Sequence, residues 1–328
     1  MTIQKTLMLL ILLPLLLLAN EDRPPIAYDY LGKPAVQQFI LMMHTDYGFK
    51  KSYIEKTLKE AKLDRDTLAR YSGKFKKNST IGSWERFKLH VVNPQTFQEA
   101  KVFKQKSFLT LQKAEDIYDV DMDYIVGFLG VESHFGTYMG DYNVLDALAT
   151  LAFHKNRMQA FFKNELKHLF LFARQNDYDI KTLQGSFAGA MGCVQQLPSV
   201  ALHFNEDFDG DGASVWDTED CIGSIAKFMH ENGWKKGHVV AVGTHFKGKR
   251  FNKLHTSHKK MLLLTRIYKA GVTPLQPFSE SKAYLLKTRN KTHDDIWMGG
   301  KNFHVLTRYN NATSYGLAIH LIAKSLKP

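Results

Sequence analysis

The residues that decide the fold run from 124 to 136 and read Tyr-Ile-Val-Gly-Phe-Leu-Gly-Val-Glu-Ser-His-Phe-Gly. Asp121 or Asp123 is suited to cap the start of this apolar run, which predicts a buried helix over 121–136 with Glu132 in its last turn. Apolar neighbours and the negative end of the helix dipole would both raise the pKa of that carboxylate. A carboxylic acid that keeps its proton near neutral pH is suited to general acid catalysis. Taken alone, the run fits a solvated surface glutamate as well.

The composition describes a basic globular chain. Its 328 residues are 44% hydrophobic and 12% aromatic, enough for one large or two modest domains with a sizeable core. Lys plus Arg number 44 against 32 Asp plus Glu, and the net charge of +12 favours a polyanion or an anionic envelope as partner. A basic surface without a specific polyanion is equally compatible. Nucleic acid is not expected, because the chain has no dense Arg/Lys block, zinc-finger spacing or RNA-binding signature.

The first residues predict export. Lys5 precedes the apolar stretch Thr6–Ala19, which is short for a transmembrane helix and fits the core of a secretory signal. Leu17 makes the cleavage site poor, so residues 1–19 are either a removed signal peptide or a retained N-terminal anchor. No cysteine precedes Cys193, which excludes a lipoprotein anchored through an N-terminal cysteine.

The chain has only two cysteines, Cys193 and Cys221. Export would permit a disulfide between them. Free or buried thiols fit the sequence equally well, because the distance between the two residues does not follow from their spacing.

The rest of the chain predicts a mainly α protein with a small β part. Helical periodicity is found over 35–70, 93–120, 143–153, 157–176, 220–232 and 314–325. Alternating stretches predict strands over 283–289 and 303–307, with Gly299-Gly300 as a turn, and a loop is expected over 71–85. The expected parts are a polar leader (20–34), an N-terminal helical part (35–120), a core (121–234), and a small antiparallel β part with a terminal helix (235–328).

An acidic loop begins at Asp207 and reads Asp-Phe-Asp-Gly-Asp-Gly-Ala through Ala213. It matches the first half of an EF-hand, in which alternate side chains supply oxygen ligands to Ca²⁺ and the glycine permits a sharp turn. An EF-hand carries a bidentate Glu where this chain has Thr218, so Asp220 or Glu219 has to supply the last carboxylate. The expected ligands are Asp207, Asp209, Asp211, Asp220 and the carbonyl of Ala213. An Asp/Gly turn without an ion is the alternative.

These motifs together resemble the membrane-bound lytic transglycosylase B family of bacterial peptidoglycan-cleaving enzymes. The blocks that match in order and spacing are Val126–Gly136, Leu145–Phe153, Gly185–Gly192, the acidic loop, Gly223–Ala226, Gly233-Trp234 and Thr307–Asn310. Weaker similarity reaches back to about residue 35. The resemblance implies a lysozyme-like, mainly helical core with added helical and small β parts. It also implies a periplasmic location, soluble or held through the N-terminal segment.

The resemblance implies cleavage of the β-1,4 bond between N-acetylmuramic acid (MurNAc) and N-acetylglucosamine (GlcNAc) without water. Glu132 falls on the family's catalytic Glu. It would protonate the leaving oxygen and then take the proton of the muramoyl O6 hydroxyl as that oxygen attacks C1, leaving a 1,6-anhydromuramoyl end. The internal hydroxyl would thus replace the second carboxylate and the water of the usual glycosidase scheme. No organic cofactor is implied, and Ca²⁺ would be structural.

The resemblance also implies a glycan groove. Ser186, Gln195, Arg157, Tyr309 and Asn310 fall on family positions that line it. The protein's partners would be peptidoglycan glycan strands, and other cell-wall enzymes are further candidates. Without the resemblance, Ser186 fits a helix cap and Tyr309 a core aromatic residue with a satisfied hydroxyl.

The chain departs from the family pattern near these positions. Ser133-His134-Phe135 replaces Thr-Arg-Trp after the catalytic Glu, Met158 replaces a second arginine, and Phe228 replaces a groove tyrosine. The loop Cys193–Val200 replaces aromatic-Gly-Gln-Phe-Met-Pro-Ser-Ser. These changes bear on substrate preference and calcium geometry more than on reaction type.

Three other functions stay open. A lysozyme-type muramidase, which hydrolyses the same bond, would need a second carboxylate across the groove, and the sequence offers no clear one. A non-catalytic peptidoglycan-binding or scaffold protein would keep only the groove. A calcium-dependent binding module would bind the ion without turning over glycan.

Overall fold

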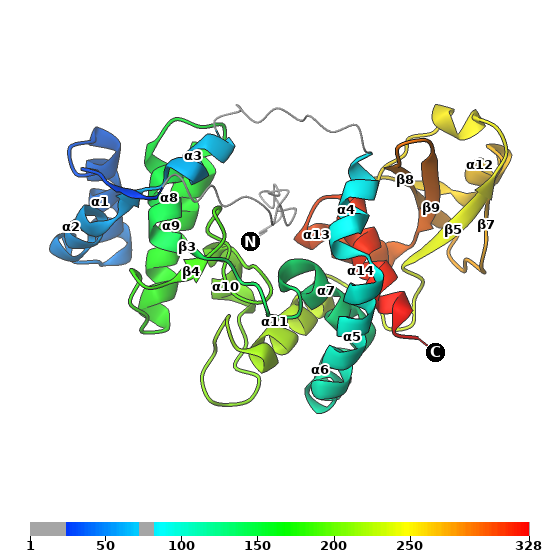
Figure 1. Ribbon diagram of the computed structural model, residues 1–328, viewed down its shortest axis with the longest axis horizontal. Helices are drawn as coiled ribbons and strands as arrows, with labels where there is room; N and C mark the ends of the chain where they lie inside the picture. The colour runs from blue at the N-terminus through cyan, green and yellow to red at the C-terminus, as the bar shows by residue number, and fades with distance from the viewer. Residues whose placement is uncertain (1–23, 72–81, 328) are drawn as a thin grey trace. The chain divides into compact units, whose positions relative to one another are not determined.

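The computed structural model describes residues 24–71 and 82–327, which form two compact units (Figure 1). The described residues of unit 1 are 82–135 and 222–327, and those of unit 2 are 24–71 and 136–221. The apolar segment 1–19, the start of the polar leader and most of the loop expected over 71–85 lie outside the described residues. None of the helices in the described ranges combines the length and apolar character that a membrane crossing requires.

Unit 2 is built on two long neighbouring helices, α8 and α9. Every residue of α8 is buried, and α9 packs along it. Asp146 in α8 accepts a hydrogen bond from the backbone N–H of Lys62 (2.7 Å) and thereby attaches β2 to this helix. Its elements are β1 (Ile26–Ala27), α1 (Pro34–Tyr47), α2 (Lys51–Glu60), β2 (Lys62–Leu63), α3 (Arg65–Tyr71), β3 (Tyr142–Asn143), α8 (Val144–Phe153), α9 (Gln159–Gln175), β4 (Gln184–Gly185) and α10 (Pro198–Phe204).

Unit 1 combines a group of helices with an antiparallel sheet. The sheet has the strand order β6-β8-β9-β5-β7 and a core of its own, which includes Val242, Leu285 and Met298. Helix α11 (Thr218–Glu231) begins in unit 2 and continues in unit 1. The other elements are α4 (Ser83–Val91), α5 (Pro94–Lys106), α6 (Phe108–Tyr118), α7 (Met122–Ser133), β5 (Ala241–Phe246), η1 (Arg250–Lys253), β6 (Met261–Leu263), α12 (Leu264–Lys269), β7 (Val272–Pro274), β8 (Lys282–Arg289), β9 (Asp294–Gly299), α13 (Lys301–Tyr309) and α14 (Thr313–Ser325).

The predicted fold class is confirmed: the described chain is mainly helical, with a small antiparallel β part near its C-terminus. The strand predicted over 303–307 is wrong, because these residues lie in α13. The alternation of apolar residues there coincides with a helical spacing, in which Phe303 and Leu306 are buried three residues apart. Gly299-Gly300 joins β9 to this helix instead of two strands. The division of the chain into consecutive parts stays a prediction.

A glycine sets the approach of α14 to α7. A Cβ atom at Gly127 would lie 2.7 Å from the backbone oxygen of Ile319, so only glycine permits this distance. The two helices are neighbours in Figure 1. Tyr315, in the first turn of α14, is thereby brought to the C-terminal end of α7.

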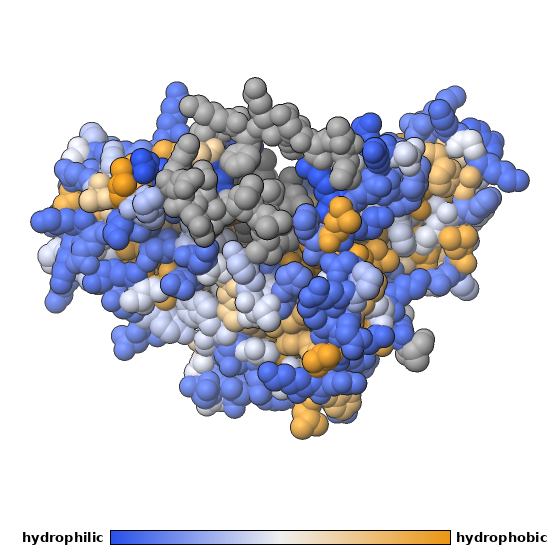
Figure 2. All heavy atoms as spheres, viewed as in Figure 1, coloured by the Kyte–Doolittle hydropathy of each residue, from blue (hydrophilic) through white to orange (hydrophobic). Residues whose placement is uncertain are grey.

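The surface seen in Figure 2 is mostly hydrophilic, with hydrophobic side chains in separate small groups. One group lies at the lower edge of the view over α6, where Leu109 is 79% exposed and Ile117 55% exposed. The largely hydrophilic face agrees with a chain whose net charge is +12.

Candidate active site

Helix α7 ends one residue after Glu132, as the sequence predicts. The C-cap residue His134 adopts a left-handed conformation (φ 49°), and Phe135 follows it with φ 59°. The backbone N–H of Phe135 donates to the carbonyl of Leu129 (3.0 Å) and closes the helix end. This termination leaves Glu132 partly exposed at the end of an otherwise buried helix.

The start of α7 is held differently from the prediction. Asp121 occupies the N-cap position, but its side chain makes no capping bond. Its carboxylate instead accepts hydrogen bonds from the indole N–H of Trp234 (2.9 Å) and the backbone N–H of Gly237 (3.3 Å). The first N–H of the helix, at Met122, donates to the carboxylate of Glu115 (3.1 Å). A residue from the preceding helix therefore supplies the cap, which local spacing does not reveal.

Aromatic rings surround the end of α7 on the side of Glu132. Tyr315 donates a hydrogen bond from its hydroxyl to Oε1 of Glu132. The ring of Tyr309 lies 4.9 Å from that of Phe228 and 5.3 Å from that of Phe128, centroid to centroid. Tyr315 stacks nearly parallel to Tyr309, at 6.5 Å and 8°. The candidate acid thus faces a cage of four rings, which we call the aromatic cage: Phe128, Phe228, Tyr309 and Tyr315.

Burial raises the pKa of Glu132 to about 8, and the hydrogen bond from Tyr315 opposes part of that rise. The same burial, together with the charge of Glu132, holds the pKa values of both cage tyrosines well above their usual range. The carboxyl group therefore keeps its proton at neutral pH. Because Oε1 accepts from Tyr315, Oε2 is left to carry the proton and present it to a substrate.

Among the described residues, no second carboxylate contributes to the pKa of Glu132. The two causes of its shift are desolvation and the Tyr315 hydroxyl. A glycosidase of the two-carboxylate type brings its pair to within a few ångströms or about one water apart, where the charges influence each other. Among the described residues, burial and not a neighbouring carboxylate therefore sets the pKa of Glu132.

Tyr309, one of the two predicted groove residues of unit 1, lies beside the acid. Tyr309 is the last residue of α13 and belongs to the aromatic cage. Asn310 follows it at the C-cap position and is 5% exposed. The structure therefore brings Glu132 and Tyr309 together, with Asn310 next in the chain, while the other predicted groove residues belong to unit 2.

Ser186 and Gln195 lie on two tight turns of unit 2. The hydroxyl oxygen of Ser186 accepts hydrogen bonds from the N–H groups of Ala190 (3.1 Å) and Ala188 (3.4 Å), which close a turn and do not cap a helix. Gln195 has a left-handed backbone (φ 48°), and its side-chain amide donates to the carbonyls of Met139 and Gly192, both at 2.9 Å. Both side chains are only partly exposed, so their orientation is set by the turns.

Arg157 is exposed just before α9. Its guanidinium carbon lies 5.9 Å from the centroid of the Tyr71 ring, at the edge of cation–π range. Met158 next to it is partly buried. The arginine is therefore available to an acidic group of a ligand.

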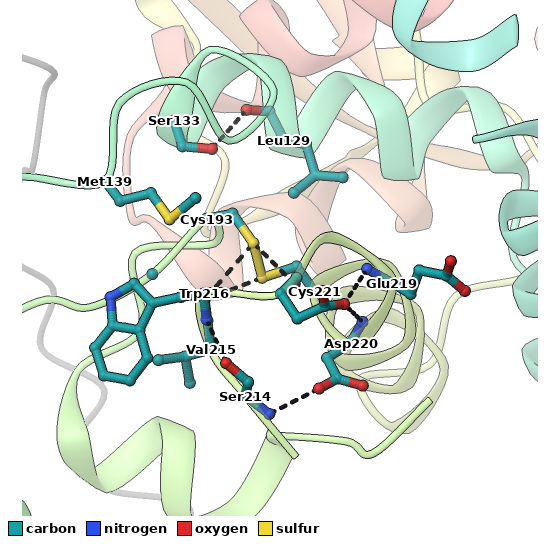
Figure 3. The surroundings of a disulfide bond; sticks show 12 residues. Leu129, Ser133, Met139, Cys193, Ser214, Val215, Trp216, Glu219, Asp220 and Cys221 are labelled. Atoms are coloured by element: carbon teal, nitrogen blue, oxygen red, sulfur yellow. Dashed lines mark hydrogen bonds between the residues drawn. A yellow bond between two sulfur atoms is a disulfide. The ribbon is translucent and has the colours of Figure 1, made fainter. Parts of the chain in front are cut away.

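Cys193 and Cys221 form a disulfide (Figure 3) with a Cα–Cα distance of 6.2 Å. The sequence left this pairing open. The bond joins the turn that carries Gln195 to the first turn of α11, directly beside Asp220.

The acidic loop gathers three of its predicted ligands. Carboxylate oxygens of Asp207, Asp209 and Asp220 lie within 4.8 Å of one another. Gly212 has φ 116°, so the sharp turn expected after Asp211 is present. A hydrogen bond to Asp209 and the charge of that residue raise the pKa of Asp211, so the carboxylates repel one another in the absence of a cation. This oxygen-rich donor set is of the kind that Ca²⁺ prefers.

Comparisons with known proteins agree with these features. The transglycosylase SLT domain family matches residues 32–324, nearly the whole chain. The chain belongs to this family. It is 35% identical to membrane-bound lytic murein transglycosylase B of Escherichia coli strain K12 over 306 residues, which cover 91% of this chain and 84% of the relative. As a member of the transglycosylase SLT domain family, it is a glycan-cleaving enzyme of the lytic transglycosylase type.

Solved structures of the E. coli lytic transglycosylase Slt35 are similar to this chain over 94% of its length. The Slt35 complex with bulgecin A superposes with a TM-score of 0.85 at 33% identity, covering 94% of this chain and 98% of that one. The Slt35 complex with calcium has a TM-score of 0.83 at 33% identity and the same coverage. This transglycosylase SLT domain protein therefore has the lysozyme-like fold of Slt35, and a relative with that fold is known with bound calcium.

Sequence reasoning missed Tyr315. The residue lies 183 positions from Glu132, so no local pattern connects the two. One signal was available: Tyr315, Ile319 and Ile322 share the buried face of α14 at helical spacing, and a tyrosine on such a face usually has a polar partner.

Proposed function

We propose that this transglycosylase cleaves the MurNAc-β-1,4-GlcNAc bond of peptidoglycan with Glu132 as its sole acid and base, forming 1,6-anhydromuramoyl ends. The observation that carries the proposal is the place of Glu132 at the end of a buried helix, beside Tyr309 and hydrogen-bonded by Tyr315, where burial raises its pKa to about 8. A single acid that is protonated at rest fits a reaction in which the substrate supplies its own nucleophile.

In the first step the protonated Oε2 of Glu132 donates to the glycosidic oxygen while the C1–O bond breaks. The leaving sugar departs with its new hydroxyl, and positive charge develops at C1. Glu132 becomes a carboxylate, which the Tyr315 hydroxyl stabilises through its hydrogen bond to Oε1. That bond is stronger to the charged form, so it helps the proton to leave.

In the second step the carboxylate takes the proton of the muramoyl O6 hydroxyl as that oxygen bonds to C1. The transfer restores the protonated acid and leaves a 1,6-anhydro ring, so atoms and charge balance without water. The aromatic cage supports this outcome, since three of its rings are buried and limit the access of water that would compete with O6.

We propose that the predicted groove residues hold the glycan strand for this reaction. Tyr309 offers a ring face for stacking on a sugar, and Asn310 offers an amide for hydrogen bonds. Ser186 and Gln195 would bind acetamido and hydroxyl groups, and Arg157 would pair with acidic groups of the substrate. The basic net charge of +12 supports a place in the periplasm at the anionic wall, with residues 1–19 as signal or anchor.

We further propose that the acidic loop holds one structural Ca²⁺. Asp207, Asp209 and Asp220 already converge, and Asp211 and the Ala213 carbonyl complete the predicted set. The ion would relieve the repulsion that raises the pKa of Asp211, and so tie the loop to the start of α11. The reaction itself needs no metal step, because Glu132 and O6 account for both proton transfers.

The test is mass spectrometry of fragments released from purified peptidoglycan sacculi by the wild type and by Glu132→Gln. Anhydromuramoyl ends from the wild type alone would support the proposal. Reducing ends would indicate hydrolysis by a muramidase. Binding to sacculi without any release would indicate a scaffold, and full release by Glu132→Gln would refute the role of Glu132.

A further inference from the structure

We propose that the Cys193–Cys221 disulfide positions Gln195, by tying the turn 192–196 to the acidic loop so that the two move as one rigid part. The inference rests on the proposed function in treating Gln195 as a substrate-binding residue, and its calcium readout rests on the proposed calcium site. The tie itself is a property of the described residues of unit 2.

The turn that carries Gln195 is tightly closed. Met191 and Gln196 exchange two backbone hydrogen bonds (2.8 and 2.9 Å), and the N–H of Gln195 donates to the carbonyl of Gly192 (3.1 Å). Gln195 sits in the left-handed region, which is unfavourable for a residue with a Cβ atom. A conformation of this kind persists only where its surroundings enforce it.

The surroundings are supplied on one side by the segment before α11. Cys193 donates its N–H to the carbonyl of Val215 (3.0 Å), and a Cβ atom on Gly192 would lie 1.8 Å from that same oxygen. The turn therefore lies directly on residue 215. The disulfide adds a covalent attachment at this point, and both of its cysteines are 1% exposed.

The other partner of the disulfide belongs to the acidic loop. Asp220 is fully buried and accepts hydrogen bonds from the N–H groups of Phe208 (2.6 Å) and Ser214 (2.7 Å). These two bonds gather both ends of the loop at one carboxylate. Cys221 follows Asp220 directly (Figure 3). Only a few rotatable bonds therefore separate the acidic loop from the turn that carries Gln195, and the disulfide fixes their relative position.

The attachment lies where this chain departs from the family motif that its sequence resembles. The family motif that the turn resembles has an aromatic residue at position 193 and glycine at 194, where this chain has Cys193 and Val194. An exported protein can form this disulfide by thiol–disulfide exchange, in which two thiols lose their protons and electrons to a donor disulfide that is reduced in turn.

The experiment compares the wild type, Cys193→Ala/Cys221→Ala, Gln195→Ala and the triple variant. Alanine removes the bond without leaving a buried polar group. We expect the double variant to raise KM about tenfold with kcat changed less than about threefold. Adding Gln195→Ala to it should cost much less than in the wild-type background, because the two changes remove the same contact. If Gln195→Ala raised KM by the same factor in the wild type and in the double variant, the inference would be overturned.

Hydrogen exchange provides a readout that does not depend on catalysis. Reduction of the wild type should speed amide exchange over 191–197 and weaken calcium binding measured by calorimetry, while the buried helix α8 stays protected. Reductant should change nothing in the double variant, which controls for side effects. Unchanged exchange at the turn, or exchange lost equally in α8, would overturn the inference. If the wild type released no anhydro product, the proposed function would fail. Hydrogen exchange would still show whether the disulfide holds the turn 192–196 to the acidic loop.

Discussion

The two regions that carry the proposed chemistry handle carboxylates in opposite ways. At the end of α7 one carboxyl group stands among four aromatic rings, and burial alone raises the pKa of Glu132 to about 8. In the acidic loop the carboxylates are crowded, and it is mainly Asp209 that raises the pKa of Asp211. The first arrangement favours a bound proton and the second a bound cation. A carboxyl side chain is thus suited to acid catalysis or to ion binding according to what surrounds it.

The largest effect tests the acid at the end of α7. Glu132→Gln keeps the shape of the side chain and removes the proton, so we expect turnover to fall about a thousandfold or more with the fold intact. The measurement is muropeptide release together with a melting curve. Glu60→Gln, which changes an exposed carboxylate of unit 2, is the matched control and should keep full activity.

The next effect concerns the hydrogen bond that Tyr315 donates to the acid. Tyr315→Phe removes the hydroxyl that lowers the pKa of Glu132. We expect kcat to fall roughly tenfold to a hundredfold, because the carboxylate formed in the first step loses its donor. The alkaline limb of the pH–rate profile should move to higher pH.

The comparator for that variant is Tyr309→Phe, which removes a hydroxyl from the same aromatic cage. Burial and the Tyr315 hydroxyl shift the pKa of Glu132, so Tyr309→Phe should leave the alkaline limb in place. If both variants moved the limb equally, Tyr315 would have no special role.

The charged region is tested by calcium. We expect Ca²⁺ to raise the melting temperature by a few degrees in the wild type and not in Asp209→Ala, since binding to the folded state alone stabilises it. Glu219→Ala should keep the response, because Glu219 is absent from the cluster of converging oxygens. If Ca²⁺ left the melting temperature unchanged, the proposal that the acidic loop binds calcium would be wrong.

The smallest effect is on stability and depends on pH. The pKa of Glu132 is about 8 in the folded chain, whereas the ordinary pKa of a glutamate is 4.5. The folded chain therefore binds this proton more tightly than the unfolded chain does. Folding is therefore penalised increasingly as pH rises from about 4.5 to about 8, and no further above that. Glu132→Gln lacks this penalty, so its melting temperature should gain on the wild type across this window. A constant difference from pH 5 to 8 would contradict the raised pKa.

The sequence alone determined the local features. The apolar run with Glu132 at its end predicts a buried helix and a raised pKa, and the alternation of aspartates predicts the loop whose oxygens converge. Both follow from spacing within a few residues, where one period or one motif has one common structure. The family resemblance, carried by the order of such motifs, extended this to the fold.

Only the tertiary structure decided what lies across the chain from these motifs. Tyr315 reaches Glu132 because Gly127 lets α14 approach α7, and Glu115 instead of Asp121 caps the helix. Residues 303–307 form a helix although their alternation suggested a strand. The pairing of Cys193 with Cys221 likewise depends on where the chain returns. In each case the partner is chosen by packing of distant segments, which short-range periodicity does not encode.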